Sequence, residues 1–257
     1  MKPLIIGHRG ASAHAPENTM AAFRLALEQG ADGVEFDVRL SRDGIPVVIH
    51  DDTLKRTGAH PAKVSSLTLS ELKKIDVGGW FKSNERSYQN EPLPTLSEVF
   101  ELFAKASGLL YLEMKSEPDC LSELAEACCH SLRQSTLKSR VIVECFDLNG
   151  IQLIKQLDSD IKTAALFEPN LRTPPGITSS KKLIDKALSV EADEIALHHR
   201  LASPRTVLSA LDAGLNVVVW TVDDPKWINL ATSRNIAALI TNTPERMISA
   251  RSHVSRI

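Results

Sequence analysis

The chain has 257 residues, of which 43% are hydrophobic and 24% charged, so it can build one large core of the size common in α/β barrels. The formal net charge is -2, which excludes the basic excess that nucleic acids and anionic membranes usually select, and no nucleic-acid partner is expected. Small, neutral-to-acidic metabolites are the ligand class that this composition leaves open.

The N-terminal segment has a single lysine and an apolar run at 4–6 that is too short for the hydrophobic region of a secretory signal. No apolar stretch of about 18 residues follows anywhere in the sequence. We therefore expect a cytoplasmic protein without an integral membrane segment. Nothing in the sequence indicates an oligomeric state.

Short β-rich runs alternate with longer amphipathic stretches almost from end to end, which is typical of βα units and a parallel sheet. The expected strands are 4–8, 33–39, 109–115, 141–146, 162–167, 194–198, 217–222 and 237–241. The expected helices are 19–29, 96–105, 121–132, 148–157, 181–190, 204–213, 225–234 and 244–250. Eight strands fit a closed barrel, so the pattern predicts a single (β/α)8 TIM-type barrel domain over residues 1–257.

Residues 51–94 interrupt this alternation and are predicted to be an insertion after the second strand region. They follow a turn at 41–44 and a short strand at 47–50, and they are too long for an ordinary βα loop. A helical piece is expected near 69–75. Because βα loops surround the active site of a barrel, we expect the insertion to form a wall or cap of the site, with a surface ornament as the alternative.

The four cysteines do not have the paired spacing of a zinc site. They are Cys120, Cys128, Cys129 and Cys145. We interpret all of them as reduced thiols, as expected in the cytoplasm. A catalytic thiol at Cys145 stays open as an alternative, although no partner residue for it is evident.

Polar residues close several of the apolar strands, and barrel enzymes place catalytic groups at such strand ends. The residues that stand there are His8, Arg9, Glu35, Asp37, His50, Asp51, Glu113 and Lys115. The sequence has no Walker-type loop, serine-hydrolase elbow or His-Glu-x-x-His pair, so nucleoside-triphosphate, serine-hydrolase and zincin chemistry lose their usual support. Metal-assisted chemistry is the class that remains.

Glu35 and Asp37 are two residues apart in a strand, so both side chains should point to the same face. Without a cation two adjacent carboxylates repel each other, whereas a divalent cation lets both stay ionised. Glu113 would be the third ligand. Oxygen ligands favour Mg2+, Ca2+ or Mn2+ over Zn2+. The alternative is that Glu35 and Asp37 are exposed or form salt bridges.

His8 and His50 are placed to transfer protons, because imidazole is the side chain suited to acid–base work near neutral pH. Arg9 and Lys115 could hold phosphate oxygens, Arg9 through a bidentate fork and Lys115 as a point charge. For each histidine a structural role is the alternative. For the two cations it is an ion pair with the neighbouring carboxylates.

Several motifs, taken together and in this order, resemble the glycerophosphodiester phosphodiesterase family over almost the whole chain. They are His8-Arg9-Gly10, Pro16-Glu17-Asn18-Thr19, Glu35-x-Asp37, His50-Asp51 with Leu54-x-Arg56-Thr57, Gly79-Trp80-Phe81, Pro92-Leu93-Pro94-Thr95-Leu96, Leu112-Glu113-Met114-Lys115, Phe146-Asp147 and Trp220-Thr221-Val222. The resemblance implies metal ligands at Glu35, Asp37 and Glu113, an acid–base pair at His8 and His50, and phosphate contacts at Arg9 and Lys115.

The resemblance also implies that Glu17 and Asn18 shape the edge of the site and that Trp220 lines its glycerol side. Helix capping by Asn18 or Thr19 is the alternative for that block, and core packing is the alternative for Trp220.

The chain departs from the family pattern at two positions. The family often has Ser where Cys145 stands and Asp where Asn242 stands. Neither position is a metal ligand or a proton-transfer group in the resemblance, so we expect activity to survive both changes.

The function implied is divalent-metal-dependent hydrolysis of glycerophosphodiesters to sn-glycerol 3-phosphate and an alcohol. The nucleophile is either water or the 2-hydroxyl of the substrate. Two alternatives stay open: a lysophospholipase D-like diesterase that uses Trp80, Phe81 and Tyr88 as an apolar rim against a membrane, and a catalytically silent phosphate-binding barrel.

Overall fold

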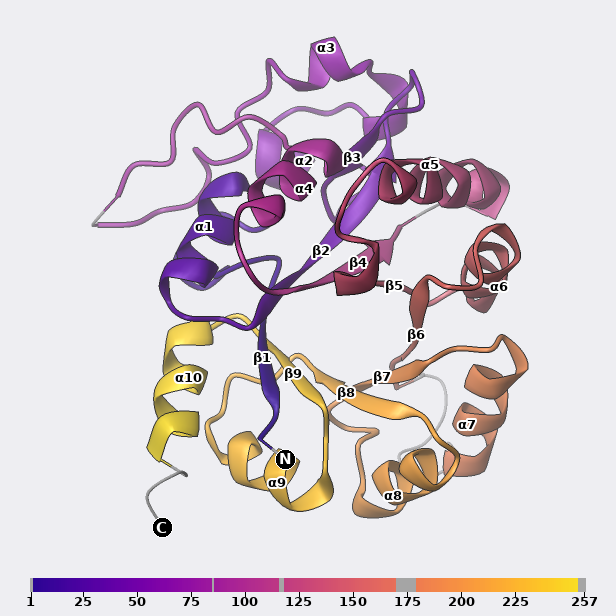
Figure 1. The fold of residues 1–257 in the computed structure, drawn as a ribbon. Coiled ribbons are helices and arrows are strands. Elements are labelled where there is room, and N and C mark those ends of the chain that lie inside the picture. The colour runs from indigo at the N-terminus through magenta and orange to yellow at the C-terminus, as the bar shows by residue number, and fades with distance from the viewer. Residues whose placement is uncertain (1, 85, 116–117, 170–178, 254–257) are drawn as a thin grey trace.

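Eight parallel strands form a closed barrel within the described residues of the computed structural model, which are 2–84, 86–115, 118–169 and 179–253 (Figure 1). The first strand pairs with both the second and the last, and this pairing closes the ring. The barrel strands are β1 Leu4–His8, β2 Gly33–Leu40, β4 Leu109–Met114, β5 Val141–Cys145, β6 Lys162–Phe167, β7 Glu194–His198, β8 Asn216–Trp220 and β9 Ala238–Thr241. The predicted (β/α)8 barrel is confirmed.

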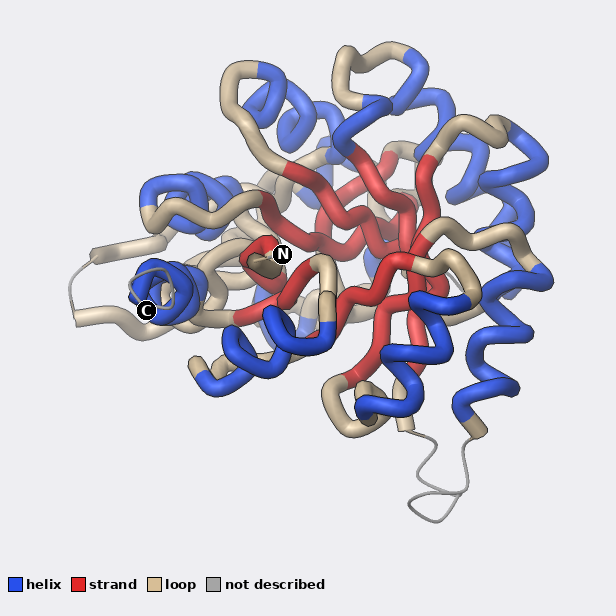
Figure 2. The backbone as a smooth tube through the Cα atoms, turned by 60° about the horizontal axis from the view of Figure 1, so that its bottom comes forward, coloured by secondary structure: helices blue, strands red, loops and turns tan. Residues whose placement is uncertain are grey.

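Helices that follow the strands along the chain cover the outside of the barrel (Figure 2). They are α1 Met20–Glu28, α4 Leu96–Ala104, α5 Leu121–Arg133, α6 Leu148–Leu157, α7 Ser180–Ser189, α8 Pro204–Asp212, α9 Lys226–Arg234 and α10 Pro244–His253, with short turns η2 Pro118–Cys120 and η3 Lys138–Arg140. The helix starts follow the sequence, because side-chain oxygens accept from free N–H groups of the first turn. Thr19 caps α1 in this way, and Thr95 forms a capping box with Glu98 at α4.

Apolar side chains fill both faces of the strands, and their alternation decides where the polar residues point. Val34, Phe36 and Val38 of β2 pack outward against the helices. A second cluster fills the barrel interior with Ile6, Tyr111, Ile142, Ala164, Leu166, Ala196, Val218, Ala238 and Ile240. Because successive side chains alternate across a strand, Glu35 and Asp37 face the interior.

The strand register aligns polar residues at the carboxyl-terminal rim. His8 of β1 is paired with Glu35 of β2, and Asp37 is paired with Glu113 of β4. Glu113 is in turn paired with Glu144 of β5. Adjacent strands therefore bring these groups to the end of the barrel where enzymes of this architecture place their active sites.

The segment between β2 and α4 departs from the strand–helix alternation. A turn at 41–44, in which Gly44 has a φ of 75°, leads into β3 Pro46–Val48, antiparallel to β2. The elements of residues 51–94 are α2 Lys55–Gly58, η1 Val64–Ser66 and α3 Leu69–Leu72. The helix expected at 69–75 ends at Leu72, after which the Ile75 N–H donates to the Leu72 carbonyl oxygen and Ile75 packs against the small core of this segment. The short helix α2 was not predicted.

The aromatic residues of this segment pack mainly against the protein itself. Phe81 lies edge-to-face against both Trp80 and Tyr88, and Phe81 and Tyr88 pack with Ala15 beside α1. Trp80 is 37% exposed. This packing favours a small internal core over the apolar rim of the membrane alternative. Among the residues that the structure describes, each helix is too short or too polar to span a bilayer.

Candidate active site

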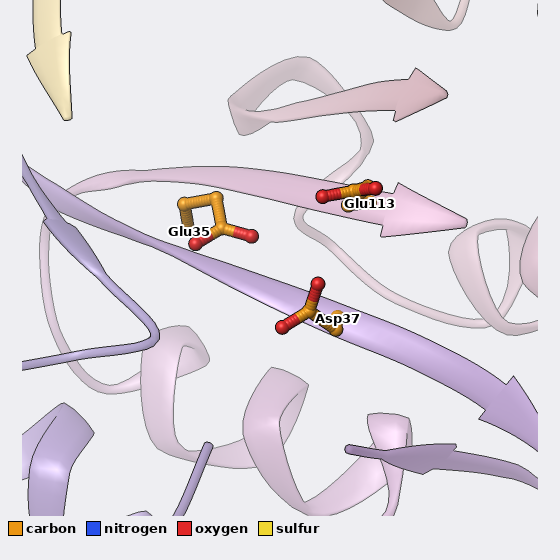
Figure 3. A group of neighbouring side chains, drawn as sticks. All are labelled: Glu35, Asp37 and Glu113. Carbon is orange, nitrogen blue, oxygen red and sulfur yellow. The ribbon is translucent and has the colours of Figure 1, made fainter. Parts of the chain in front are cut away.

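Three buried carboxylates meet at the rim of the barrel (Figure 3). Glu35, Asp37 and Glu113 are exposed by only 2%, 0% and 7%, and each offers an oxygen within 4.8 Å of the others. Glu35 and Asp37 come from β2 and Glu113 from the neighbouring β4. The structure thus brings together all three residues that the sequence predicts as metal ligands.

The electrostatics of this cluster suit a divalent cation. Burial and the charge of Asp37 raise the pKa of Glu35 well above its ordinary value and that of Glu113 to about 7. Burial alone would raise the pKa of Asp37, but Arg9 and Lys115 lower it to about 2. Within the described residues, Oε1 of Glu35 has no hydrogen-bond partner. A buried, unpaired oxygen in an all-oxygen set is what a hard cation such as Mg2+ or Ca2+ would satisfy.

The two predicted phosphate-binding cations lie against these carboxylates. Lys115 Nζ is 2.6 Å from Glu113 Oε1 and 3.3 Å from Asp37 Oδ1. Arg9 Nε is 3.0 Å from Asp37 Oδ2, and the backbone N–H of Arg9 donates to Glu35 Oε2 at 3.0 Å. Both cations therefore form the ion pairs that the sequence left as the alternative to phosphate binding.

His8 lies at the end of β1 with its two ring nitrogens in different surroundings. Its Nδ1 is 2.7 Å from Oδ1 of Asn242, and its Nε2 is 3.8 Å from Oε2 of Glu35. Burial, followed by the charge of Arg9, lowers the pKa of His8 to about 4. The imidazole is therefore neutral near pH 7 in this environment.

His50 is held by a carboxylate rather than an amide. Its Nδ1 lies 2.7 Å from Oδ1 of Asp51. Arg56 of the 51–94 segment donates to both oxygens of Asp51 and to both oxygens of Glu17, at 2.7–3.0 Å. Glu17 also accepts from Arg9 at 2.8 Å. A continuous chain of charges therefore links Arg9 to His50 through the segment 51–94.

The adjacent residues Asn18 and Thr19 have different roles. Thr19 is the helix cap, since its hydroxyl oxygen accepts from the N–H of Ala22. Asn18, with a φ of 58°, donates from Nδ2 to Asp37 Oδ2 at 2.8 Å and accepts from the Asp37 N–H at 3.2 Å. Asn18 thus holds both the side chain and the backbone of a predicted metal ligand.

A cavity of about 310 Å3 opens beside these groups. It is lined by His8, Arg9, Glu35, His50, Glu113, Lys115, Glu144, Phe146, Leu166, Glu168, Trp220 and Ile240. Trp220 is half-buried, with its ring edge-to-face against Phe146 at 5.5 Å and His198 at 5.2 Å. Trp220 therefore both packs and lines the cavity, so each of its two sequence interpretations has a basis in the structure.

Sequence reasoning missed several residues of this site. Glu144 is 1% exposed, and its Oε2 has no hydrogen-bond partner among the described residues. A carboxylate inside the apolar run 141–145 is the same signal that identified Glu113, so it could have been found. Arg39 donates to the backbone oxygens of His50 at 2.8 Å and Lys115 at 3.4 Å, a contact that no local pattern predicts.

Cys145 belongs to the core. Its side chain is buried, its Sγ donates to the carbonyl oxygen of Met114 at 3.4 Å, and burial raises the pKa of the thiol to about 12. A thiol of this kind is protonated at neutral pH and is a poor nucleophile. The catalytic-thiol alternative therefore has no support.

The glycerophosphoryl diester phosphodiesterase family model matches residues 8–246. The chain belongs to this family. It is 34% identical to a glycerophosphodiester phosphodiesterase of Caldanaerobacter subterraneus subsp. tengcongensis, and the match covers 97% of this chain and 98% of the relative. As a member of the family, the chain is a phosphoric diester hydrolase.

Solved structures agree with the assignment to the glycerophosphoryl diester phosphodiesterase family. A phosphodiesterase of Oleispira antarctica, solved with the product sn-glycerol 3-phosphate, is 30% identical, with a TM-score of 0.87 over 98% of this chain and 97% of that one. A glycerophosphodiester phosphodiesterase of Thermotoga maritima is 28% identical, with a TM-score of 0.77 over 98% and 99% of the two chains.

Proposed function

We propose that this phosphodiesterase hydrolyses glycerophosphodiesters to sn-glycerol 3-phosphate and an alcohol in the cavity at the barrel rim. The observation that carries the proposal is the meeting of three buried carboxylates with His8 and His50 in and beside one cavity. The relatives named above support the substrate class. A cytoplasmic location stays a prediction, which fractionation of expressing cells would test.

Glu35, Asp37 and Glu113 would hold one divalent cation, Mg2+, Ca2+ or Mn2+. The fit rests on their all-oxygen donor set and on the unpaired Oε1 of Glu35. When bound, such a cation supplies Lewis-acid polarisation of a phosphate oxygen. It would also offset the burial and the charge of Asp37 that raise the pKa values of Glu35 and Glu113.

Arg9 and Lys115 bind the phosphate in this proposal. Both line the cavity and both are held by carboxylates that a divalent cation would also engage. Their charges are thus available to a phosphate diester, with Arg9 kept in place by Glu17 at 2.8 Å.

His8 and His50 move the protons. One imidazole removes a proton from the attacking oxygen, and the other donates one to the departing alcohol. Each ring has its Nδ1 anchored at 2.7 Å, by Asn242 or by Asp51. Each Nε2 is therefore the atom that exchanges the proton. The attacking oxygen belongs to water or to the 2-hydroxyl of the substrate.

The remaining predicted residues shape the cavity. Glu17 ties Arg9 to Arg56 and so joins the segment 51–94 to the site as one wall. Trp220 provides an apolar surface for the glycerol carbons, next to Phe146.

Release of the alcohol from glycerophosphoethanolamine, glycerophosphocholine and a lysophospholipid tests the proposal. The other product should be sn-glycerol 3-phosphate from the first two and an acylated glycerol phosphate from the lysophospholipid. Hydrolysis of the first two that disappears with a chelator and returns with Mg2+, Ca2+ or Mn2+ would support it. Preference for the lysophospholipid, together with flotation on liposomes, would favour the lysophospholipase D-like alternative. Binding of metal and glycerol 3-phosphate without turnover of any diester would identify a silent barrel.

A further inference from the structure

Behind His8, on the side away from the carboxylates, lies the hydrogen-bonded pair of Asp223 and Asn242, the second of which is a position where the chain departs from the family pattern. Asn242 follows β9 and Asp223 follows β8, and β9 lies between β1 and β8 in the sheet. Asn242 Oδ1 is 2.7 Å from His8 Nδ1, while Asn242 Nδ2 donates to Asp223 Oδ2 at 2.9 Å. The three side chains form one line from the loop after β8 to the active-site imidazole.

Asp223 is itself fixed by two further donors. Its Oδ1 accepts from the backbone N–H of Asn242 at 2.8 Å and from the Thr241 hydroxyl at 2.8 Å. Its other oxygen is therefore directed at the Asn242 amide. The carboxylate cannot turn away without breaking both contacts.

This arrangement decides the orientation of the Asn242 amide. A carboxylate oxygen only accepts hydrogen bonds, so the group that faces Asp223 Oδ2 must be the NH2. The reverse orientation would place two acceptor oxygens 2.9 Å apart. The Ser12 hydroxyl, 2.9 Å from Asn242 Oδ1, can donate and is compatible with the orientation that Asp223 imposes.

The amide orientation in turn decides the tautomer of His8. An amide oxygen only accepts, so His8 Nδ1 must carry the hydrogen. In the neutral ring the lone pair is then on Nε2, which lies on the side of Glu35 and the cavity. The hydrogen bond also fixes the plane of the ring.

We propose that Asp223 and Asn242 are positioning residues that hold His8 in the Nδ1–H tautomer, with Nε2 presented to the reacting oxygen. This rests on the proposed role of His8 as a proton-transfer group. Asp51 anchors His50 Nδ1 directly with a carboxylate, whereas Asp223 reaches His8 through one amide. Partners of this kind orient an imidazole without touching the substrate.

An isosteric cycle of three variants tests the pair with little change of shape. Asp223→Asn places an NH2 group against either the Asn242 NH2 or the backbone N–H of residue 242. Two donors would then face each other, so the side chain of residue 223 or that of Asn242 must turn away. Asn242→Asp places two carboxylates 2.9 Å apart. In the double variant each donor again faces an acceptor, because the amide at position 223 donates to a carboxylate at position 242, and this carboxylate accepts from His8.

We expect each single variant to lower kcat about ten- to hundred-fold with KM nearly unchanged, the size typical of lost imidazole anchors. The double variant should recover to within roughly a few-fold of the parent protein, since contacting residues couple. Asp224→Asn is the matched control. It makes the same charge change one residue along, where the carboxylate pairs with Lys226, and it should leave kcat unchanged.

A second readout does not depend on activity. In protein with 15N-labelled histidine, the imidazole spectrum of neutral His8, assigned with a His8→Gln variant, should show the hydrogen on Nδ1. Asp223→Asn should abolish or mix that pattern.

Hydrogen on Nε2 in the parent protein would overturn the inference, as would single variants with unchanged kcat or a double variant no better than the worse single one. If the parent protein released no glycerol 3-phosphate, the proposed function would fail, and the tautomer spectrum would still decide whether the pair sets the His8 ring.

Discussion

The two halves of the barrel rim contribute different kinds of group to the same cavity. The strands and loops up to residue 115 supply the carboxylates, histidines and cations of the proposed chemistry. The later strands supply Phe146 and Trp220, which stack edge-to-face, and the anchor of His8. We infer that the first half carries the reaction and that the second half carries substrate fit and support.

The two halves are also stabilised by different kinds of interaction. In the first half, the buried charge of Asp37 is stabilised by opposite charges, because Arg9 and Lys115 both lie within 3.3 Å of it. Removing one member leaves its partner buried and unpaired, which is strongly unfavourable. In the second half the cavity contacts are mainly aromatic packing. There the free energy lost when a side chain is removed grows with the apolar area that the side chain kept from water.

The largest effect should come from the metal ligands. Asp37→Asn should weaken binding of the divalent cation and lower kcat/KM on the order of a thousand-fold or more, because several kcal/mol of charge stabilisation would be lost. Calorimetric titration with Mg2+, Ca2+ and Mn2+ and assay of glycerol 3-phosphate would measure both. Asp52→Asn, on an exposed carboxylate of the same half, is the control. Unchanged metal affinity in Asp37→Asn would remove this residue from the metal site.

The histidines come next. His8→Ala and His50→Ala should each lower kcat by about a hundred- to ten-thousand-fold, the usual contribution of acid–base assistance. Metal affinity and melting temperature should stay close to those of the parent protein. His130→Ala, on the exposed side of α5, is the matched control. Turnover within a few-fold of the parent in both active-site variants would show that neither imidazole transfers a proton.

The two halves also differ in how much of them could be predicted from the sequence. The period-two alternation at Glu35 and Asp37, and the carboxylate at Glu113, sufficed to identify the acidic cluster, because strand geometry fixes the direction of each side chain. The same rule would have found Glu144.

Partners that are distant in the chain could not be predicted in this way. His8 and Asn242 are 234 positions apart, and their contact exists only because closure of the barrel places β9 beside β1. Likewise Arg56 reaches Glu17 across 39 positions. Such contacts depend on tertiary packing, which no local pattern in one sequence encodes.

The affinity of the three-carboxylate site for a divalent cation should depend on pH. Burial and the charge of Asp37 raise the pKa of Glu35 well above its ordinary value and that of Glu113 to about 7, so a cation that binds these carboxyls competes with protons. Affinity should therefore rise with pH and fall as pH drops below about 7, by up to about tenfold per unit for each proton displaced. Calorimetry in two buffers of different ionisation enthalpy would count the protons released. Affinity independent of pH between 5.5 and 8 would contradict this sign.

The smallest effect should come from the aromatic half. If the Trp220 ring covers about 50 Å2 of the glycerol, its loss would weaken binding by roughly 1.3 kcal/mol, which is about tenfold. Trp220→Ala should therefore raise KM for glycerophosphoethanolamine with kcat changed little, since no reacting atom contacts the ring in the proposal. Trp220→Phe keeps an aromatic surface next to Phe146 and should recover most of the loss.

A diester without glycerol, bis(p-nitrophenyl) phosphate, separates the two interpretations of Trp220. If the ring holds glycerol, Trp220→Ala should raise KM for glycerophosphodiesters and change KM for bis(p-nitrophenyl) phosphate little. A ring that serves only in packing against Phe146 and His198 should lower the melting temperature and affect both substrates alike. The second outcome would assign Trp220 to the core, and substrate fit would then have to come from another part of the cavity, where Glu144 and Glu168 are the polar groups of the same half.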